Sequence, residues 1–375
     1  MIYADFKDKK LSLLGMGTMR LPLKSDNYAE IDEKRAEEMF DYAFEHGVNY
    51  FDTAWGYHNG QSEIVTGKLL KKYPRDKVYI ATKFPGYDLA NMDKVEEIFC
   101  RQLEKTGMEY FDFYLFHNVC EKNIEQYLDE KYGIYEYLIE QKKNGRIRHL
   151  GFSVHSNNDT MKRFLEKYGK DMEFCQVQFN WIDYDFQDAK TKLEILKEYD
   201  IPMWVMEPLR GGKLAKLSPE HEKLLKQLRG DENIPAWSFR FLQTFPEIKM
   251  ILSGMSDFEQ VKDNIRTFEE NKPLNENEMD TLFDIARNML GNSTACTSCK
   301  YCLNKCPQEI DIPRMISLYN EHVFSNGGFI APNVIETIKE ENRPSACIGC
   351  KSCEEVCPQG INISKIMSDF AEKLK

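Results

Sequence analysis

Four side chains capable of acid–base chemistry follow apolar, strand-like runs in the first third of the chain. They are a carboxylate, a phenol, an amine and an imidazole, namely Asp52, Tyr57, Lys83 and His117. In a parallel barrel the C-terminal ends of the strands open on one face, so groups distant in sequence can converge there. The sequence therefore predicts that these four groups meet at the mouth of a barrel.

Strands and helices must position these groups. The sequence alternates eight times between segments typical of strands and segments typical of helices, which is the pattern expected of a (β/α)8 TIM barrel of the α/β class. We predict strands at residues 13–19, 48–54, 78–83, 111–117, 147–153, 174–180, 203–207 and 249–254. Amphipathic helices lie between them, as at 32–46, where apolar residues recur at helical spacing.

The sequence around the four groups resembles that of the aldo-keto reductases, and the resemblance covers residues 10–270. The matching residues include Asp52-Thr53-Ala54 before Tyr57, and then Gly60, Ser62 and Glu63. The resemblance implies the strand order of the barrel. It also implies an enzyme that reduces an aldehyde or ketone to an alcohol with NAD(P)H.

Roles for the four groups are also carried over by this resemblance. Tyr57 is then the general acid, and Lys83 lowers the pKa of its hydroxyl. Asp52 holds Lys83 charged and oriented. His117 orients the carbonyl and polarises it as charge develops on oxygen.

Nicotinamide contacts carry over less completely. Ser153 and Gln176 match the residues that bind the nicotinamide amide, whereas Val154 stands where the family usually has Asn. Met206 occupies the position of a stacking aromatic, and a thioether can still pack on a ring.

The adenosine end of the cofactor matches a later segment, in which Ser253, Asp263 and Asn264 are the expected contacts. Members that select NADPH place cations here for the 2′-phosphate. This segment has only Lys262 and the later Arg266, so the choice between NADPH and NADH stays open.

Eight of the eleven cysteines lie in the last 85 residues. They form two copies of one motif, in which two residues separate each of the first three cysteines and a fourth cysteine is followed by proline. Such runs bind 4Fe-4S clusters, and the fourth cysteine of each run ligates the other cluster. We therefore predict one cluster on Cys296, Cys299, Cys302 and Cys357, and a second on Cys347, Cys350, Cys353 and Cys306. Zinc is the rival interpretation. Cys100, Cys120 and Cys175 are scattered and receive no role.

The tail that carries these cysteines resembles an α-helical, dicluster ferredoxin-like domain. Its helices are expected near 313–325 and 332–341. The Gly291-Asn292-Ser293 break predicts a barrel domain at 1–290 and a cluster domain at 291–375. Together, the two parts resemble the iron-sulfur subgroup of aldo-keto reductases, which is found in anaerobes.

Three functions remain compatible with the sequence. The barrel reduces a small-molecule carbonyl while the clusters are structural or sense redox state. Alternatively, the clusters deliver single electrons from a ferredoxin or flavoprotein partner to the barrel. In the third case the protein is a non-catalytic, nicotinamide-binding subunit for electron transfer or redox sensing.

Composition limits the partners. The formal net charge is -11, nearly all of it before residue 291, and no basic face is signalled. This argues against nucleic acid and against anionic membranes. No apolar run is long enough to span a bilayer, so we expect a cytoplasmic protein.

Overall fold

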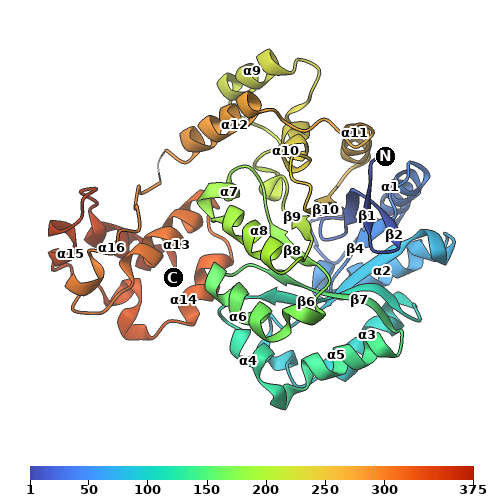
Figure 1. Cartoon of the computed structure of the whole chain (residues 1–375), viewed down its shortest axis with the longest axis horizontal. Coiled ribbons are helices and arrows are strands. Elements are labelled where there is room, and N and C mark those ends of the chain that lie inside the picture. The colour runs from blue at the N-terminus through green and yellow to red at the C-terminus, as the bar shows by residue number, and fades with distance from the viewer. Residues whose placement is uncertain (292) are drawn as a thin grey trace. The chain divides into compact units, whose positions relative to one another are not determined.

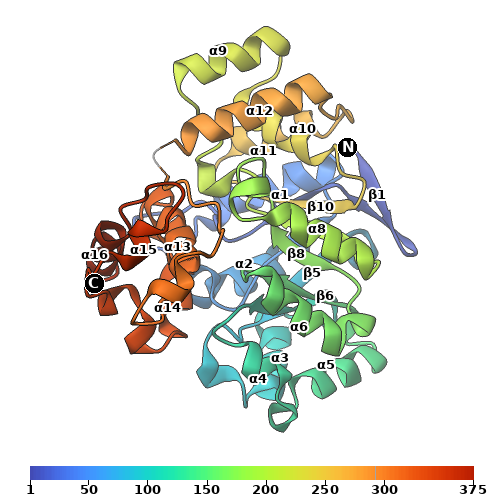
Figure 2. The same cartoon turned by 60° about the vertical axis from the view of Figure 1, so that its left-hand side comes forward.

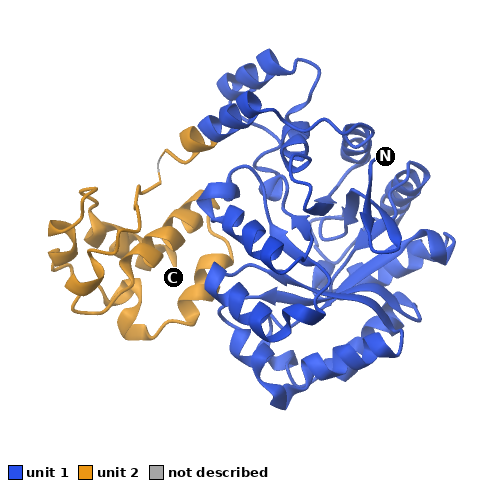
Figure 3. Cartoon of the chain, viewed as in Figure 1, with its two compact units in different colours: residues 1–285 blue, residues 286–375 orange. Residues whose placement is uncertain are grey.

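A computed structural model describes residues 1–291 and 293–375. The chain divides into two compact units, Met1–Ile285 and Ala286–Lys375, shown in Figure 3. The division falls inside helix α12 (Glu276–Met289), a few residues before the predicted boundary at 290/291. A reciprocal capping box begins this helix, because the Asn275 side chain accepts from the Glu278 amide while the Glu278 carboxylate accepts from the Asn275 amide.

The first unit is a closed barrel of eight parallel strands in the order β10-β3-β4-β5-β6-β7-β8-β9. Figure 1 shows strands of this barrel in the middle of the unit. The strands are β3 (Leu14–Gly17), β4 (Tyr50–Asp52), β5 (Tyr79–Phe84), β6 (Phe111–Val119), β7 (Ile147–Val154), β8 (Cys175–Gln178), β9 (Met203–Met206) and β10 (Ile248–Gly254). The predicted barrel is confirmed. Its strands read as apolar runs because both of their faces are buried.

Helices alternate with these strands and lie outside the ring, as Figure 2 shows. They are α1 (Glu33–Glu45), α2 (Gln61–Leu70), α3 (Val95–Thr106), α4 (Ile124–Leu128), α5 (Ile134–Lys143), α6 (Asn158–Tyr168), α7 (Asp183–Phe186), α8 (Ala189–Glu198), α9 (Pro219–Leu228), α10 (Ile234–Leu242) and α11 (Phe258–Thr267). Helix α1 begins where predicted, because the Asp32 side chain accepts a hydrogen bond from the Arg35 amide.

A hairpin that the sequence analysis missed packs against the N-terminal ends of the strands. It consists of β1 (Tyr3–Phe6) and β2 (Lys9–Ser12), and Phe6 lies edge-on to Trp204 at 5.0 Å. Beside it, the Glu173 carboxylate accepts from His149 Nδ1 at 2.8 Å and pairs with Lys7 and Lys142. The hairpin and this ionic cluster lie at the end of the barrel away from the predicted site.

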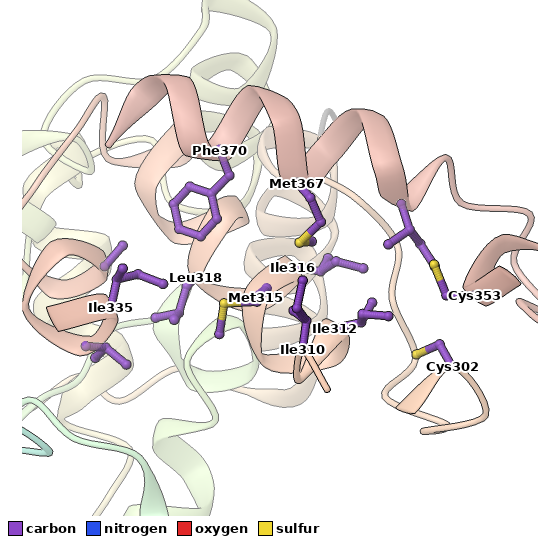
Figure 4. Close-up of a cluster of buried hydrophobic side chains, with 13 residues drawn as sticks. Cys302, Ile310, Ile312, Met315, Ile316, Leu318, Ile335, Cys353, Met367 and Phe370 are labelled. Atoms are coloured by element: carbon purple, nitrogen blue, oxygen red, sulfur yellow. The ribbon is translucent and has the colours of Figure 1, made fainter. Parts of the chain in front are cut away.

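The second unit is helical: α13 (Ile312–Phe324), α14 (Ile330–Glu336), α15 (Ser352–Glu355) and α16 (Ile363–Lys373). Thirteen buried side chains form its core, including Cys302 and Cys353 (Figure 4). Helix α14 ends before the predicted residue 341, because the Arg343 guanidinium binds the carbonyls of Ile338 and Glu336 and turns the chain.

No helix within the described part of the chain is both long enough and apolar enough to cross a membrane.

Candidate active site and cluster sites

The central feature of the barrel mouth is a buried ion pair. Asp52 is the last residue of β4 and Lys83 lies near the end of the neighbouring β5. Lys83 Nζ donates to Asp52 Oδ1 at 2.6 Å and to the Thr53 carbonyl at 2.7 Å. The two residues are 0% and 3% exposed. Taking a lone charge out of water costs several kcal/mol, so each side chain depends on the other.

Tyr57 and His117 complete the group. The Lys83 ammonium lies 5.2 Å from the centroid of the Tyr57 ring. The imidazole of His117 faces the same ring edge-on at 6.2 Å, and Tyr87 packs edge-on against that imidazole at 5.1 Å. All four predicted side chains therefore meet at one mouth of the barrel, where their strands end.

The protonation state of the site differs from the expectation in one respect. Burial raises the pKa of Tyr57 well above its usual value, and the charge of Asp52 adds to this effect. Burial and the Asp52 charge therefore outweigh the acidification expected from Lys83. Burial, followed by the Lys83 charge, holds the pKa of His117 well below its usual value. At neutral pH the site therefore presents a protonated phenol and a neutral imidazole.

The turn after Tyr57 is held in a strained backbone conformation. His58 and Asn59 both have φ of 51°, in the left-handed region that non-glycine residues seldom adopt. His58 is completely buried. Its Nε2 accepts from the Leu21 amide at 3.2 Å, and its ring stacks on Tyr28 at 4.4 Å. These contacts fix the segment that carries Tyr57, a positioning role that the sequence analysis did not assign.

Glu63 is a second positioning group that received no role from the sequence. It is completely buried in α2. Its carboxylate accepts from Thr82 Oγ1 and Lys105 Nζ, each at 2.6 Å, and from Gln102 Nε2 at 2.7 Å. Gln102 also donates to the Lys83 carbonyl at 3.0 Å. The only sequence signal for Glu63 was that it is one of the residues that match the aldo-keto reductases.

The predicted nicotinamide contacts lie on neighbouring strands. Ser153 of β7 pairs with Gln176 of β8, and Gln178 of β8 pairs with Met206 of β9. The Gln176 amide nitrogen approaches the Met206 sulfur at 3.5 Å, whereas no donor among the described residues reaches its buried oxygen. Ser153 Oγ is already engaged, since it accepts from the Asn118 amide at 2.8 Å.

Of the predicted adenosine contacts, two are brought together. Asn264 is buried, and its amide donates to Ser253 Oγ at 3.0 Å. Asp263 instead faces solvent and pairs with Arg266 at 2.8 Å. Lys262 pairs with Glu259 at 2.9 Å. Both cations of this helix therefore already have carboxylate partners.

The eight cysteines line two cavities in the second unit. The lining of one includes Cys296, Cys299, Cys302 and Cys357. The lining of the other includes Cys306, Cys347, Cys350 and Cys353. These are the two sets that the sequence predicted. Four thiols around an otherwise apolar cavity fit the donor set of a 4Fe-4S cluster.

Comparison with known proteins agrees with this geometry. A model described as the aldo/keto reductase family matches residues 13–287. The chain belongs to this family. A second model, a 4Fe-4S dicluster domain, matches residues 295–362, so this aldo/keto reductase carries an iron-sulfur domain after its barrel.

Individual relatives are distant. The chain is 24% identical to an NADH-specific methylglyoxal reductase of Escherichia coli over 69% of its own length and 90% of that protein. A holo-form aldo-keto reductase of Bacillus halodurans superposes with a TM-score of 0.62 at 23% identity, over 76% of this chain and 96% of the other. An NADPH complex of a Klebsiella pneumoniae aldo-keto reductase superposes with a TM-score of 0.59 at 19% identity, over 76% of this chain and 96% of the other. Family membership makes this protein an oxidoreductase.

Proposed function

We propose that the barrel reduces an aldehyde or ketone to an alcohol with a nicotinamide cofactor, at the group formed by Asp52, Tyr57, Lys83 and His117. The observation that carries the proposal is the completely buried Lys83–Asp52 pair beneath the Tyr57 ring. A buried ion pair is expensive to maintain and is a poor source of stability by itself. Its position under a phenol at the open end of the barrel favours a catalytic role.

In this mechanism Tyr57 donates the proton that the developing alkoxide requires. Its raised pKa keeps the hydroxyl protonated at neutral pH, and the nearby ammonium stabilises the phenolate left after transfer. Asp52 holds Lys83 in place. The neutral His117 orients the carbonyl by a hydrogen bond, without adding a positive charge that would compete with Lys83.

The residues at the mouth fit a nicotinamide. The buried Gln176 oxygen can accept from the amide of the ring, and Met206 can pack against the ring itself. Asn264, oriented by Ser253, is suited to adenine. When bound, the nicotinamide supplies the hydride for the carbonyl carbon.

We further propose NADH as the preferred cofactor. A 2′-phosphate requires fixed positive charge, but Lys262 and Arg266 are paired with Glu259 and Asp263. The Escherichia coli relative is named as NADH-specific, which agrees with this choice. We expect kcat/KM to be at least about tenfold higher with NADH than with NADPH, a difference of about 1.4 kcal/mol.

The variant Glu259→Gln tests the charge argument by freeing Lys262. It should lower KM for NADPH and leave KM for NADH unchanged. Glu269→Gln, an exposed substitution just beyond the same helix, is the matched control. Equal use of both nucleotides by the wild type would contradict the preference.

In the second unit we propose two 4Fe-4S clusters, one in each cysteine-lined cavity, that transfer electrons or sense redox state. The agreement between each cavity and one predicted ligand set supports two clusters rather than one. Each thiolate set holds its cluster among apolar side chains, including Ile312 and Ile363, which line both cavities.

The substitution Tyr57→Phe tests the barrel mechanism. It should reduce NADH-dependent reduction of carbonyl probes, beginning with methylglyoxal, by about 10³-fold, because the proton donor is lost. Iron content and cluster absorbance should remain at wild-type levels. If turnover is unchanged, Tyr57 is not the proton donor and this mechanism is wrong.

A further inference from the structure

Strand β6 departs from regular pairing just before it ends. Its register with β7 shifts between Phe116 and Val119. The two residues between them, His117 and Asn118, therefore lie opposite one residue of β7, Ser153. An irregularity of this kind re-aims side chains and is common next to active sites. Asn118 is thereby brought beside a predicted nicotinamide contact, although the proposed mechanism gives it no part.

The backbone of Asn118 is held in place on both sides. The residue has φ of 56°, in the left-handed region that Asn tolerates better than most residues. Its amide donates to Ser153 Oγ at 2.8 Å, and its carbonyl accepts from Nδ2 of the buried Asn123 at 2.9 Å. Asn123 Nδ2 also donates to the Gly86 carbonyl at 3.0 Å. Both backbone polar groups of Asn118 are therefore engaged.

The side chain of Asn118 is buried and unsatisfied. The residue is 8% exposed, and none of the described residues donates a hydrogen bond to its Oδ1. A buried acceptor without a donor is costly, so such an atom beside a binding site indicates a ligand that donates to it. Gln176, which pairs with Ser153 from the other side, has a buried Oε1 in the same condition. Ser153 is therefore flanked by two residues whose amide oxygens lack a donor.

Ser153 supplies a group of the opposite kind. Its Oγ accepts from the Asn118 amide, which leaves the hydroxyl hydrogen for another partner, and no acceptor for that hydrogen lies within the part of the chain that the structure describes. The three neighbouring residues thus offer one donor and two acceptors. A carboxamide has one acceptor oxygen and two N–H donors, which is the complementary set.

We propose that Asn118 binds the nicotinamide carboxamide, with its Oδ1 accepting one of the two N–H hydrogens. Gln176 Oε1 accepts the other, and the Ser153 hydroxyl donates to the carboxamide oxygen. Asn118 acts twice, because its backbone amide also orients that hydroxyl. Val154, the next residue of β7, has no polar side chain to share this task. The inference rests on the proposed use of a nicotinamide cofactor, and it names the groups that recognise the amide of the ring.

Calorimetric binding to the anaerobically purified holoprotein tests the proposal with two probes, NADH and reduced 3-acetylpyridine adenine dinucleotide. The second probe has a methyl ketone in place of the carboxamide, so it keeps the acceptor oxygen and lacks both N–H donors. We expect the wild type to bind NADH at least about tenfold more tightly than the analogue. Asn118→Gly should weaken NADH binding by about fivefold or more and leave the dissociation constant of the analogue unchanged.

Glycine is the informative replacement because it adopts φ of 56° without strain, so the variant removes the side chain and keeps the backbone conformation. Asp200→Gly is the matched control. Asp200 is exposed, precedes β9 and has φ of 53°, so this variant should bind both probes as the wild type does.

Two results would overturn this inference alone. If Asn118 served only the backbone turn, Asn118→Gly would bind both probes as tightly as the wild type, or would lose affinity for both equally. In either case the preference for NADH over the analogue would be unchanged. Failure of the wild type to bind either probe would instead overturn the proposed use of a nicotinamide, and this inference with it.

Discussion

The two units of this protein build their sites by opposite means. The barrel surrounds its site with a large apolar core, and its Lys83–Asp52 pair is held by neighbouring strands. Among the described residues of the second unit, the core cluster holds thirteen buried side chains, and two of these are cysteines that also line the proposed cluster cavities. We therefore expect the barrel to fold without its cofactor, and the cysteine unit to depend on the proposed clusters for much of its stability.

Removing iron should give the largest effect and separate the two units. Chelation under oxidising conditions should abolish amide protection across residues 293–375, because a core this small loses the groups that its cysteines hold. Residues 1–285 should keep their protection against hydrogen exchange. Loss of protection in both units together, or in neither, would show that their stabilities do not differ in this way.

A smaller effect, on the stability of the barrel, should come from the ionic cluster around Glu173, at the end of the barrel away from the active site. Burial raises the pKa of Glu173, but hydrogen bonds from His149, Lys142 and Lys7, together with the charge of Lys142, lower it to about 2. A carboxyl with a depressed folded-state pKa stabilises the fold above pH 4.5, and this contribution is lost as the pH falls toward 2. Discounted for solvent screening, the contribution is on the order of 1–2 kcal/mol at neutral pH.

Denaturant unfolding of Glu173→Gln measures this contribution. The variant should be less stable by about 2 kcal/mol at pH 7 and should lose less stability than the wild type between pH 4.5 and 2. Glu166→Gln, an exposed substitution on α6, serves as the control and should behave as the wild type. Parallel pH profiles for Glu173→Gln and wild type would contradict the assigned pKa.

Regular periodicity made most of the fold predictable. Strand runs and helical periodicity are local signals, so all eight barrel strands and helix α1 were found. The hairpin at residues 3–12 was missed because its short strands carry charged residues and no apolar run. Phe6 is identified as core only by distant partners such as Trp204. The predicted helix 332–341 extends beyond the end of α14. The Arg343 side chain, which lies outside that segment, binds the Ile338 carbonyl just after the helix.

For the site, the order of polar groups at strand ends predicted which residues converge, but not their electrostatics. The raised pKa of Tyr57 depends on burial and on the charge of Asp52, which only the three-dimensional arrangement determines. The positioning roles of His58 and Glu63 were missed for the same reason, since their partners lie on other elements. The cysteine spacing carried more information, because both cavities match the predicted ligand sets.

The most direct test of the account is a single-turnover measurement of NADH oxidation by the carbonyl probe, in wild type and in Lys83→Met, with both proteins holding their full iron content. The account predicts that Lys83→Met slows the chemical step by at least about 100-fold while NADH still binds and the iron-sulfur absorbance is retained. Wild-type rates in Lys83→Met would contradict it, because the buried ammonium would then have no part in the reaction.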